Sequence, residues 1–428
     1  MYNRNGRVAF SVLSLTSLTV ALALIAPPAA AFTAVPDSVG VGLGPEGMAL
    51  DVGPGLVVAN AGGDSLSLVD TSTTPMVVTS YFIPGLSQPV AVVSRPSFGD
   101  YLVVNRLSPS VAVVSAWGGV VRTYPLPPTA IPSQILVAPY DPNVWFVLDR
   151  TGAVIRIDES LGLPGFVDVF PFPVPLSTAQ FSANGTHLYV ASQWGELMDV
   201  DPRTMSVTRS FSVNGNVSGL AVQGRWAYLS AGATGVIFRV NLTTGQVREW
   251  AVGGEPGPMS LAWFGRYLFV ADRTDWALDV VKTRNGQVVN SFPLPARPHD
   301  LVLSSWNEAF VSHTLTDSVT RLRIDPDPPT PPQGWVDKRC TRSSGQVTVD
   351  LRWRRPSSQG DLPVVGYRFR AQLRNGSWTA WAYTVRTETN GSMSVPGYRP
   401  GERIPLQVQA LTQVSGSAAL GGQCTVTR

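Results

Sequence analysis

The stretch Tyr267-Leu268-Phe269-Val270-Ala271-Asp272 is a short apolar run that ends in a polar residue, and it decides the fold because the chain repeats it. Related runs occur at residues 56–60, 102–105, 145–149, 188–192, 228–230 and 310–313. Together the seven runs recur about every 40 residues between residues 45 and 325. Self-similarity at such a period indicates one structural unit repeated along the chain.

Each unit has the pattern of four short strands. A further run ends in Asp or Asn at 155–158, 198–201 and 238–241, and a glycine turn follows at 244–246. Short apolar segments separated by such turns predict antiparallel strands joined by hairpins. Four strands in about 40 residues are typical of one blade of a β-propeller. The sequence therefore predicts an all-β fold with a seven-bladed β-propeller over residues 32–325.

The first strand of each blade is expected near an apolar residue that recurs with the same period. These positions are Met48, Val92, Ile135, Phe181, Leu220, Leu261 and Leu301. Five of them follow a proline by three residues, and these prolines are interpreted as loop residues because proline lacks the donor that a central strand needs: Pro45, Pro89, Pro132, Pro258 and Pro298. The seventh unit supplies three strands only. We expect residues 39–43 to add the fourth and close the last blade, which removes exposed sheet edges.

At this level of detail the sequence resembles the YVTN type of seven-bladed β-propeller. The best matches are Leu188-Tyr189-Val190-Ala191-Ser192 and the segment Val240-Asn241-Leu242-Thr243-Thr244-Gly245. The resemblance covers about 290 residues, although residues 145–149 depart from the pattern. It implies a propeller that serves as a binding scaffold, and it says more about the fold than about activity.

The N-terminus has the layout of a cleavable secretory signal over residues 1–31. Arg4 and Arg7 precede an apolar run over residues 8–25, and Ala29-Ala30-Ala31 supplies a small-residue cleavage site. The alternative is an uncleaved membrane anchor. No other stretch approaches 18 consecutive apolar residues, so no transmembrane segment is expected after cleavage. We therefore expect a secreted protein, extracellular or associated with the cell wall, and the signal looks bacterial.

A second domain is expected after the propeller. Residues 326–332 are rich in proline and predict a stiff linker. Beyond them, period-two segments at 347–353, 366–371 and 406–410 predict the strands of a small β-sandwich over residues 333–428.

This segment resembles a fibronectin type III domain. Trp353 and Tyr367 stand at positions that the resemblance assigns to the core tryptophan and to the start of the next strand. Pro400-Gly401-Glu402 precedes the strand of Leu406. Ile404 stands where that family usually has a corner tyrosine, so the corresponding hydrogen bond is expected to be absent.

Two cysteines occur in the chain, Cys340 and Cys424, and both lie in the second domain. In an exported protein an even pair predicts a disulfide, here between the first and the last strand of the domain. Its 84-residue separation corresponds to roughly 4–5 kcal/mol of stabilisation in the chain-entropy model. A metal site at the cysteines is the weaker interpretation, since no further Cys or His lies nearby.

Charge is divided unevenly between the two domains. Residues 32–328 carry 17 basic and 24 acidic residues, a net charge of −7, and residues 329–428 carry 13 and 5, a net charge of +8. A basic domain in an exported protein favours anionic wall polymers as partners, and nucleic acid is not expected. We expect a monomer.

The polar residues at the ends of the second strands are the first candidates for a ligand site. In a propeller, the loops that leave the second strands and those that enter the first strands emerge on one face, around the central channel. The candidates at this mouth are Asn60, Asn105, Asp149, Ser192, Asp272 and His313. They predict a ring that binds a ligand, with a divalent cation left open as a cofactor. The alternative is that these side chains cap the turns that follow them.

Histidine and tryptophan provide the remaining candidates at this mouth. His299 and His313 are expected on the same face, where an acid–base pair or a metal site is conceivable, although no short ligand spacing supports either role. A further resemblance is to propeller lyases that use a histidine and a glutamate near the channel. Trp194 and Trp276 lie in corresponding loops, where exposed indoles stack on sugar rings. Packing between blades is the alternative for tryptophan.

These observations favour an exported binding or scaffold protein of the cell envelope. The channel mouth would present a surface for a glycan or an envelope protein, and the basic second domain would serve as an anchor. The alternative is a secreted polysaccharide-degrading hydrolase or lyase with its site at the same mouth. Sequence motifs for a nucleophile elbow or a phosphate loop do not occur.

Overall fold

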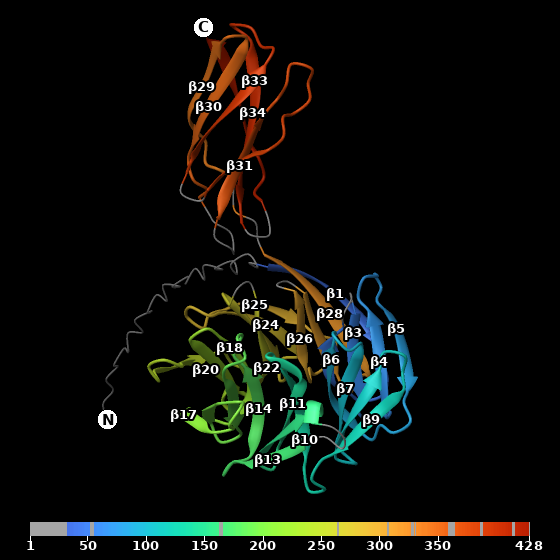
Figure 1. Ribbon diagram of the computed structural model, residues 1–428. Helices are drawn as coiled ribbons and strands as arrows, with labels where there is room; N and C mark the ends of the chain where they lie inside the picture. The colour runs from blue at the N-terminus through green and yellow to red at the C-terminus, as the bar shows by residue number, and fades with distance from the viewer. Residues whose placement is uncertain are drawn as a thin grey trace, which may run out of the picture. The chain divides into compact units, whose positions relative to one another are not determined.

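The computed structural model describes residues 32–51, 55–161, 166–262, 265–305, 308–326, 329, 331–357, 364–385, 388–412 and 416–427. Outside these ranges lie the predicted signal segment, residues 1–31, and residues 327, 328 and 330 of the predicted linker over residues 326–332. Seven four-stranded antiparallel sheets follow one another along the described chain and are arranged as blades around an axis (Figure 1). The predicted seven-bladed β-propeller is therefore confirmed.

The first six blades each use four consecutive strands, numbered from the axis outward. Blades one to three consist of β2 (Pro45–Leu50), β3 (Gly55–Asn60), β4 (Ser65–Asp70), β5 (Val77–Phe82); β6 (Pro89–Arg95), β7 (Asp100–Asn105), β8 (Ser110–Ser115), β9 (Val120–Pro125); and β10 (Pro132–Ala138), β11 (Asp141–Asp149), β12 (Ala153–Asp158), β13 (Phe166–Pro171). Blades four to six consist of β14 (Leu176–Phe181), β15 (Leu188–Ser192), β16 (Glu196–Val200), β17 (Val207–Ser212); β18 (Val217–Gln223), β19 (Trp226–Ala231), β20 (Val236–Asn241), β21 (Val247–Ala251); and β22 (Pro256–Ala262), β23 (Tyr267–Asp272), β24 (Ala277–Lys282), β25 (Val288–Pro293).

Blade seven is built from both ends of the propeller sequence. Its strands are β26 (Leu301–Ser305), β27 (Glu308–His313) and β28 (Ser318–Pro326), and β1 (Phe32–Gly40) pairs antiparallel with β28 over nine residue pairs. Figure 1 shows β1 and β28 side by side. The closing strand therefore covers 32–40 rather than the expected 39–43. Pro36 is tolerated within it because the outermost strand has an edge at which no donor is needed.

The inner strands of the first three blades begin earlier than expected. Pro45, Pro89 and Pro132 are the first residues of β2, β6 and β10 rather than loop residues, and Phe181 ends its strand instead of beginning it. A register shift follows directly in each, for example between Pro45 and Met48. A bulge at the strand entrance accommodates the proline, because the local ladder is already interrupted there. Similar shifts occur at the entrances of β14, β18 and β22.

The repeated apolar run forms the second strand of each blade and carries most of the core. In β23 all six residues from Tyr267 to Asp272 are buried. Such a strand is covered on both faces by the neighbouring blades, which explains why it is continuously apolar instead of alternating. Phe269 of blade six and Val311 of blade seven, for example, belong to one buried cluster. Packing between blades therefore explains why the second strand of every repeat is apolar.

Side-chain amides and hydroxyls join neighbouring inner strands where the backbones do not pair. The Gln134 amide donates to the Ala179 carbonyl and accepts from the Ala179 N–H, so it acts as a peptide group between blades three and four. Ser177 Oγ donates to the Val217 carbonyl of the next blade. At the seam between blades seven and one, Asp300 Oδ2 accepts from the Met48 N–H at 3.0 Å. These bonds pair buried backbone groups along the channel.

The C-terminal domain is also all-β. Its strands are β29 (Trp335–Ser343), β30 (Gln346–Trp353), β31 (Gly366–Ala371), β32 (Ala382–Val385), β33 (Asn390–Pro396), β34 (Arg403–Leu411) and β35 (Leu420–Thr427). They form one sheet in the order β32-β31-β34-β35-β29-β30-β33. The sheet is continuous only because β29 and β35 pair in parallel over two residue pairs. Trp353, Tyr367 and Phe369 form the aromatic centre of its core.

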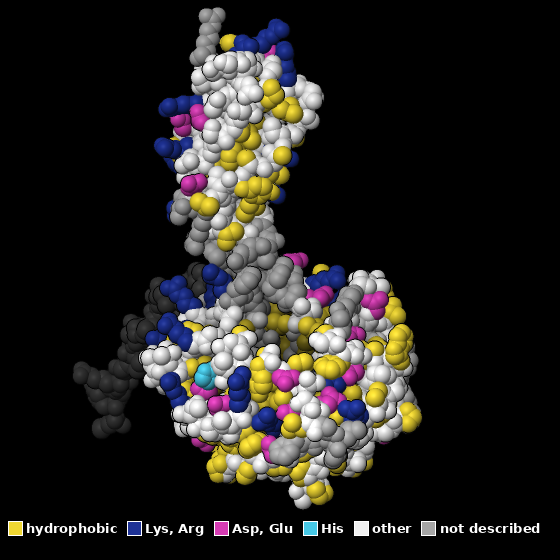
Figure 2. Space-filling model, viewed as in Figure 1, with side chains coloured by type: hydrophobic (Ala, Val, Ile, Leu, Met, Phe, Trp, Pro, Cys, Tyr) yellow, Lys and Arg dark blue, Asp and Glu magenta, His cyan; other side chains and the backbone are white. Residues whose placement is uncertain are grey.

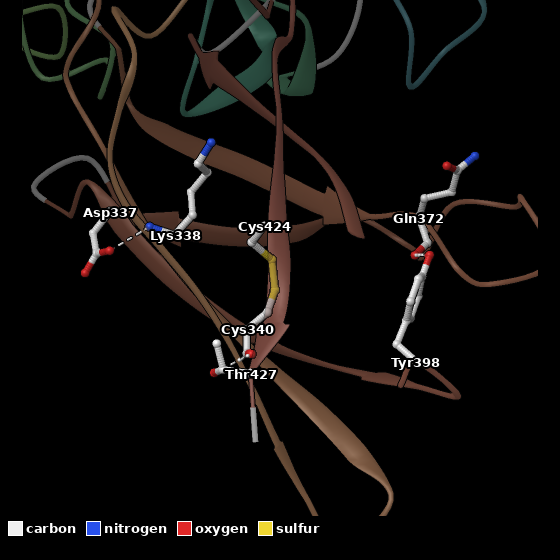
Figure 3. The surroundings of a disulfide bond; sticks show 7 residues. All are labelled: Asp337, Lys338, Cys340, Gln372, Tyr398, Cys424 and Thr427. Atoms are coloured by element: carbon white, nitrogen blue, oxygen red, sulfur yellow. Dashed lines mark hydrogen bonds between the residues drawn. A yellow bond between two sulfur atoms is a disulfide. The ribbon is translucent and has the colours of Figure 1, made fainter. Parts of the chain in front are cut away.

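Cys340 on β29 and Cys424 on β35 form a disulfide, as predicted (Figure 3). Their Cα atoms are 6.0 Å apart, and the bond joins the first strand of the domain to the last. Ile404 packs in the core of this domain, and a different tyrosine forms a hydrogen bond nearby. The buried Tyr398 donates its hydroxyl to the Gln372 carbonyl at 3.0 Å (Figure 3), so a tyrosine from the preceding loop ties that loop to another segment.

Among the described residues, no helix is long and apolar enough to cross a membrane.

Candidate functional site

A channel of about 360 Å³ runs between the inner strands of the propeller. The bulged entrances of these strands line it, together with loops that leave the second strands. Its charged and ionisable lining residues are Glu46, Arg150, Arg273, His299 and Asp300. The volume is at the lower end of the range for small-molecule sites, so the channel admits a chemical group of a ligand rather than a folded partner.

The side chains of the predicted polar ring point into the protein and not into the channel. Asn60, Asn105, Asp149, Ser192, Asp272 and His313 are all buried, with at most 4% of their surface exposed. Asp149 Oδ1 accepts from the Ile131 N–H and the Thr151 N–H, so it caps its own turn and holds the loop that enters the blade. Asp272 Oδ1 accepts from the N–H groups of Glu255 and Thr274 in the same way.

The other members of the ring also bond within the protein: Ser192 Oγ accepts from the N–H groups of Trp194 and Glu196, and His313 Nδ1 lies 3.4 Å from the Arg297 carbonyl oxygen. Asn105 accepts from the Ser87 N–H and donates to Ser110, and Asn60 contacts Ser65 and Ser67 of its own blade. The geometry therefore assigns Asn105, Asp149, Ser192 and Asp272 to the capping of turns and loops, the alternative interpretation of the pattern. These side chains hold the loops that surround the channel mouth, but they do not point into the channel.

The residue immediately after the cap occupies the position that faces the channel mouth. In blades two, three and six this residue is arginine, namely Arg106, Arg150 and Arg273. The backbone N–H of each donates to a carbonyl of the loop entering its blade, at 3.0 Å in all three. Successive side chains of an extended segment point to opposite sides, so the arginine projects away from the capping side chain. The sequence does contain these arginines, each one residue after a predicted site residue.

The arginines at this mouth differ in their partners. Arg106 forms a two-pronged ion pair with Glu46, whose closest contact is 2.6 Å, and Arg297 pairs with Glu255 at 3.0 Å. Arg150 and Arg273 make no side-chain hydrogen bond or ion pair within the described part of the chain. Two channel-lining guanidinium groups therefore lack a carboxylate partner.

Burial and like charge act on both of these groups. Burial lowers the pKa of Arg150, and the charge of Arg106 lowers it further, against the opposing effect of Glu46. Burial also lowers the pKa of Arg273, where repulsion from Arg297 and Arg150 acts against attraction by Glu255 and Asp300. Guanidinium stays charged in proteins despite such shifts. The channel mouth therefore holds positive charges that repel each other.

The structure separates the two predicted histidines by their partners. His299 lines the channel, and its Nδ1 lies 3.2 Å from the Glu46 carbonyl oxygen. His313 is fully buried, its Nε2 lies 2.9 Å from Thr320 Oγ1, and burial lowers its pKa. No hydrogen bond joins the two rings among the described contacts. A group of three His, Cys, Asp or Glu residues placed to hold a metal ion does not occur in the described ranges.

Large apolar side chains are exposed on the loops of the same face. Trp194 and Trp276, the predicted stacking residues, have 64% and 47% of their surface exposed. Other exposed residues of these loops are Leu43, Leu107, Ile131 and Leu315. Trp276 has a positive φ of 49°, which is rare for a bulky residue and places the indole at the tip of its turn. A face that carries both exposed indoles and guanidinium groups without a carboxylate partner has the composition of a binding surface.

The C-terminal domain has a basic surface of its own. Arg368 and Arg370 on β31 stack on Trp381, with guanidinium carbons 4.6 and 4.2 Å from the ring centre, and Arg370 also lies 4.8 Å from the centre of Trp378. Their Nε atoms donate to glutamine side chains of β34. Basic side chains also line the edges of this domain in the view of Figure 2. The stacked arginines form a rigid basic strip.

Comparison with known proteins establishes the fold class and no family. No family model and no curated protein sequence matches the chain. Among solved structures, hydrazine synthase of Kuenenia stuttgartiensis is 17% identical with a TM-score of 0.60, over 68% of this chain and 98% of that one. The Cps50 (Swd1) β-propeller domain of Myceliophteria thermophila is 14% identical with a TM-score of 0.57, over the same shares. Both likenesses support the seven-bladed propeller alone.

Proposed function

We propose that this chain is an exported, non-catalytic binding protein of the cell envelope or the extracellular space. Its propeller holds a glycan at the channel mouth, and its C-terminal domain, of the fibronectin type III type, anchors it to anionic polymer. The observation that carries the proposal is the exposure of Trp194 and Trp276 on loops that leave second strands, the same kind of loop that carries the channel-lining Arg150 and Arg273. Exposed indoles stack on sugar rings while polar groups bond the hydroxyls. The proposal is for a monomer with no nucleic-acid partner.

Anchoring is supported by the charge of the second domain. Its net charge of +8 and the stacked Arg368 and Arg370 offer a basic strip to wall polymers that carry phosphate or carboxylate groups. The predicted signal segment supports export, and a disulfide is favoured in an oxidising compartment. In this proposal the propeller binds the glycan, and the C-terminal domain holds the protein on the anionic polymer.

The test is a binding screen of residues 32–428 against soluble glycans and cell-wall fractions, monitored for product release. Trp194→Ala and Trp276→Ala should each weaken glycan binding by tenfold or more. Trp117→Ala is the matched control, because Trp117 is 96% exposed in the loop between β8 and β9, on the opposite face of the propeller. Equal loss in the control variant, or no binding by the parent, would contradict the proposal.

The rival function is a secreted polysaccharide-degrading hydrolase or lyase. The observation in its favour is that His299, Glu46 and Asp300 all line the channel. Against it, the Glu46 carboxylate is paired with Arg106, and Asp300 accepts backbone hydrogen bonds. Products released in the screen and abolished by His299→Ala would favour the enzyme.

A further inference from the structure

The channel mouth is positively charged although the propeller is acidic overall. The domain carries a net charge of −7, yet Arg106, Arg150, Arg273 and Arg297 gather at one end of its channel. The acidic groups near them are Glu46, Glu255 and Asp300, and the first two form ion pairs with Arg106 and Arg297. Asp300 is committed to two backbone N–H groups. The local excess of positive charge is therefore carried by Arg150 and Arg273.

The two fully buried arginines of the propeller, Arg95 and Arg321, are both paired within the described residues. Arg95 bonds both oxygens of Asp100 and also Glu159, and Arg321 bonds Asp37, two backbone carbonyls and a threonine hydroxyl. Arg150 and Arg273 contrast with these, since no described side chain or carbonyl pairs with their guanidinium groups. Arg150 is exposed and Arg273 is half-buried, so both guanidinium groups are accessible where the channel meets the solvent.

A glycine helps to hold one of the two open arginines in place. A Cβ atom on Gly257 would lie 3.0 Å from Arg273 Nε and 3.1 Å from the Ala271 carbonyl. The Arg273 side chain therefore runs against the bare backbone of β22, at the bulged entrance of the inner strand. The guanidinium is set in a position that a larger residue at 257 would disturb.

We propose that the ligand of the channel mouth is anionic, and that Arg150 and Arg273 bind a carboxylate group of an acidic polysaccharide. Guanidinium presents a planar pair of donors that matches a carboxylate, and an anion between two like charges offsets their repulsion. The small channel accommodates such a group, and Trp194 and Trp276 offer apolar faces to neighbouring sugar rings. This inference rests on the proposed glycan-binding function and names the class of glycan.

The experiment is isothermal titration of residues 32–428 with oligogalacturonate and with its methyl ester, which keeps the sugar ring and removes the charge. The free acid should bind at least tenfold more tightly than the ester, and more weakly as salt is added. Arg150→Gln and Arg273→Gln should each weaken binding of the acid about tenfold or more, because each removes a charge-assisted contact. Gly257→Ala should weaken it in the same direction.

Arg248→Gln is the matched control, since Arg248 is exposed on the outer strand β21 and is not among the residues that line the channel. It should leave both affinities unchanged. Thermal unfolding without ligand should show that Arg150→Gln and Arg273→Gln fold and are at least as stable as the parent, because each relieves like-charge repulsion.

The possible failures are distinguishable. Equal binding of acid and ester would overturn the anion assignment and leave glycan binding standing. Binding of neither would overturn both this inference and the proposed function. A poly-glutamate of equal charge that binds as tightly as oligogalacturonate would overturn the glycan assignment in favour of an acidic protein partner.

Discussion

The propeller and the C-terminal domain both join their first strand to their last, but they do so in different ways. In the propeller, β1 and β28 share nine residue pairs within blade seven. In the C-terminal domain, β29 and β35 share two pairs and are linked by the Cys340–Cys424 disulfide. The comparison teaches that a long shared edge closes a domain by hydrogen bonds, whereas a short one relies on a covalent link.

The largest effect is expected from removing the closing strand of the propeller. A chain that lacks residues 32–40 loses about nine backbone hydrogen bonds, at roughly 1 kcal/mol net each, and exposes the edge of β28. We expect the propeller to lose more than about 5 kcal/mol and to aggregate. Calorimetry of the full chain should show the propeller transition lowered or lost, with the transition of the C-terminal domain unchanged. A propeller that unfolds as before would contradict closure by β1.

The second effect should be confined to the C-terminal domain. Cys340→Ser with Cys424→Ser removes the covalent link and should cost about 4 kcal/mol, because the unfolded chain is no longer constrained. The propeller transition should not move. Chemical reduction of the parent protein is the control and should reproduce the result. Equal stability of reduced and oxidised protein would show that the two paired residues suffice to close this domain.

A third variant tests a side chain at the propeller closure. Arg321 is almost fully buried in β28 and bonds Asp37 of β1 together with carbonyls of residues 71 and 73 in blade one. Arg321→Met leaves a carboxylate and two carbonyls without their donor and should cost about 3 kcal/mol. Urea unfolding measures the change. Arg323→Met, a substitution of the exposed arginine two residues further along β28, is the control and should cost less than about 1 kcal/mol.

The smallest effect concerns pH. Burial raises the pKa of Asp279 on β24 to about 6 from an ordinary value of 3.8. The folded chain therefore binds this proton more tightly than the unfolded chain, and propeller stability should fall as the pH rises from about 4 to about 6. Asp279→Asn should remove this dependence and stabilise the propeller by about 1–2 kcal/mol at pH 7, with little change at pH 4. A variant less stable than the parent at pH 7 would show that the charged form is favoured.

Much of the fold could be predicted from local pattern. The run around Phe269 and its six counterparts is apolar because each second strand is covered by two blades, and this requirement leaves a signal in every repeat. The entrances of the inner strands were misplaced at Pro45, Pro89 and Pro132 for a physical reason. Proline is avoided in regular ladders, but here each one precedes a bulge that sequence periodicity does not reveal.

The polar residues proposed from the sequence as a ligand site have side chains that bond within the protein. Asn105, Asp149 and Asp272 do end their strands at the channel mouth, but they bond their own loops. The residues that face the channel, Arg150 and Arg273, follow them directly in sequence. Which of two adjacent polar residues caps a turn and which points outward depends on the direction of the backbone at the strand end.

The sequence by itself determined the number of blades and the pairing of the only two cysteines. These follow from repeat period, composition and residue count, which are properties of the chain. The tertiary structure alone decided that four arginines from blades two, three and six and from the loop before blade seven meet at one channel mouth, and that two of them stay unpaired. Their proximity arises from closure of the ring, which brings together residues far apart in the sequence.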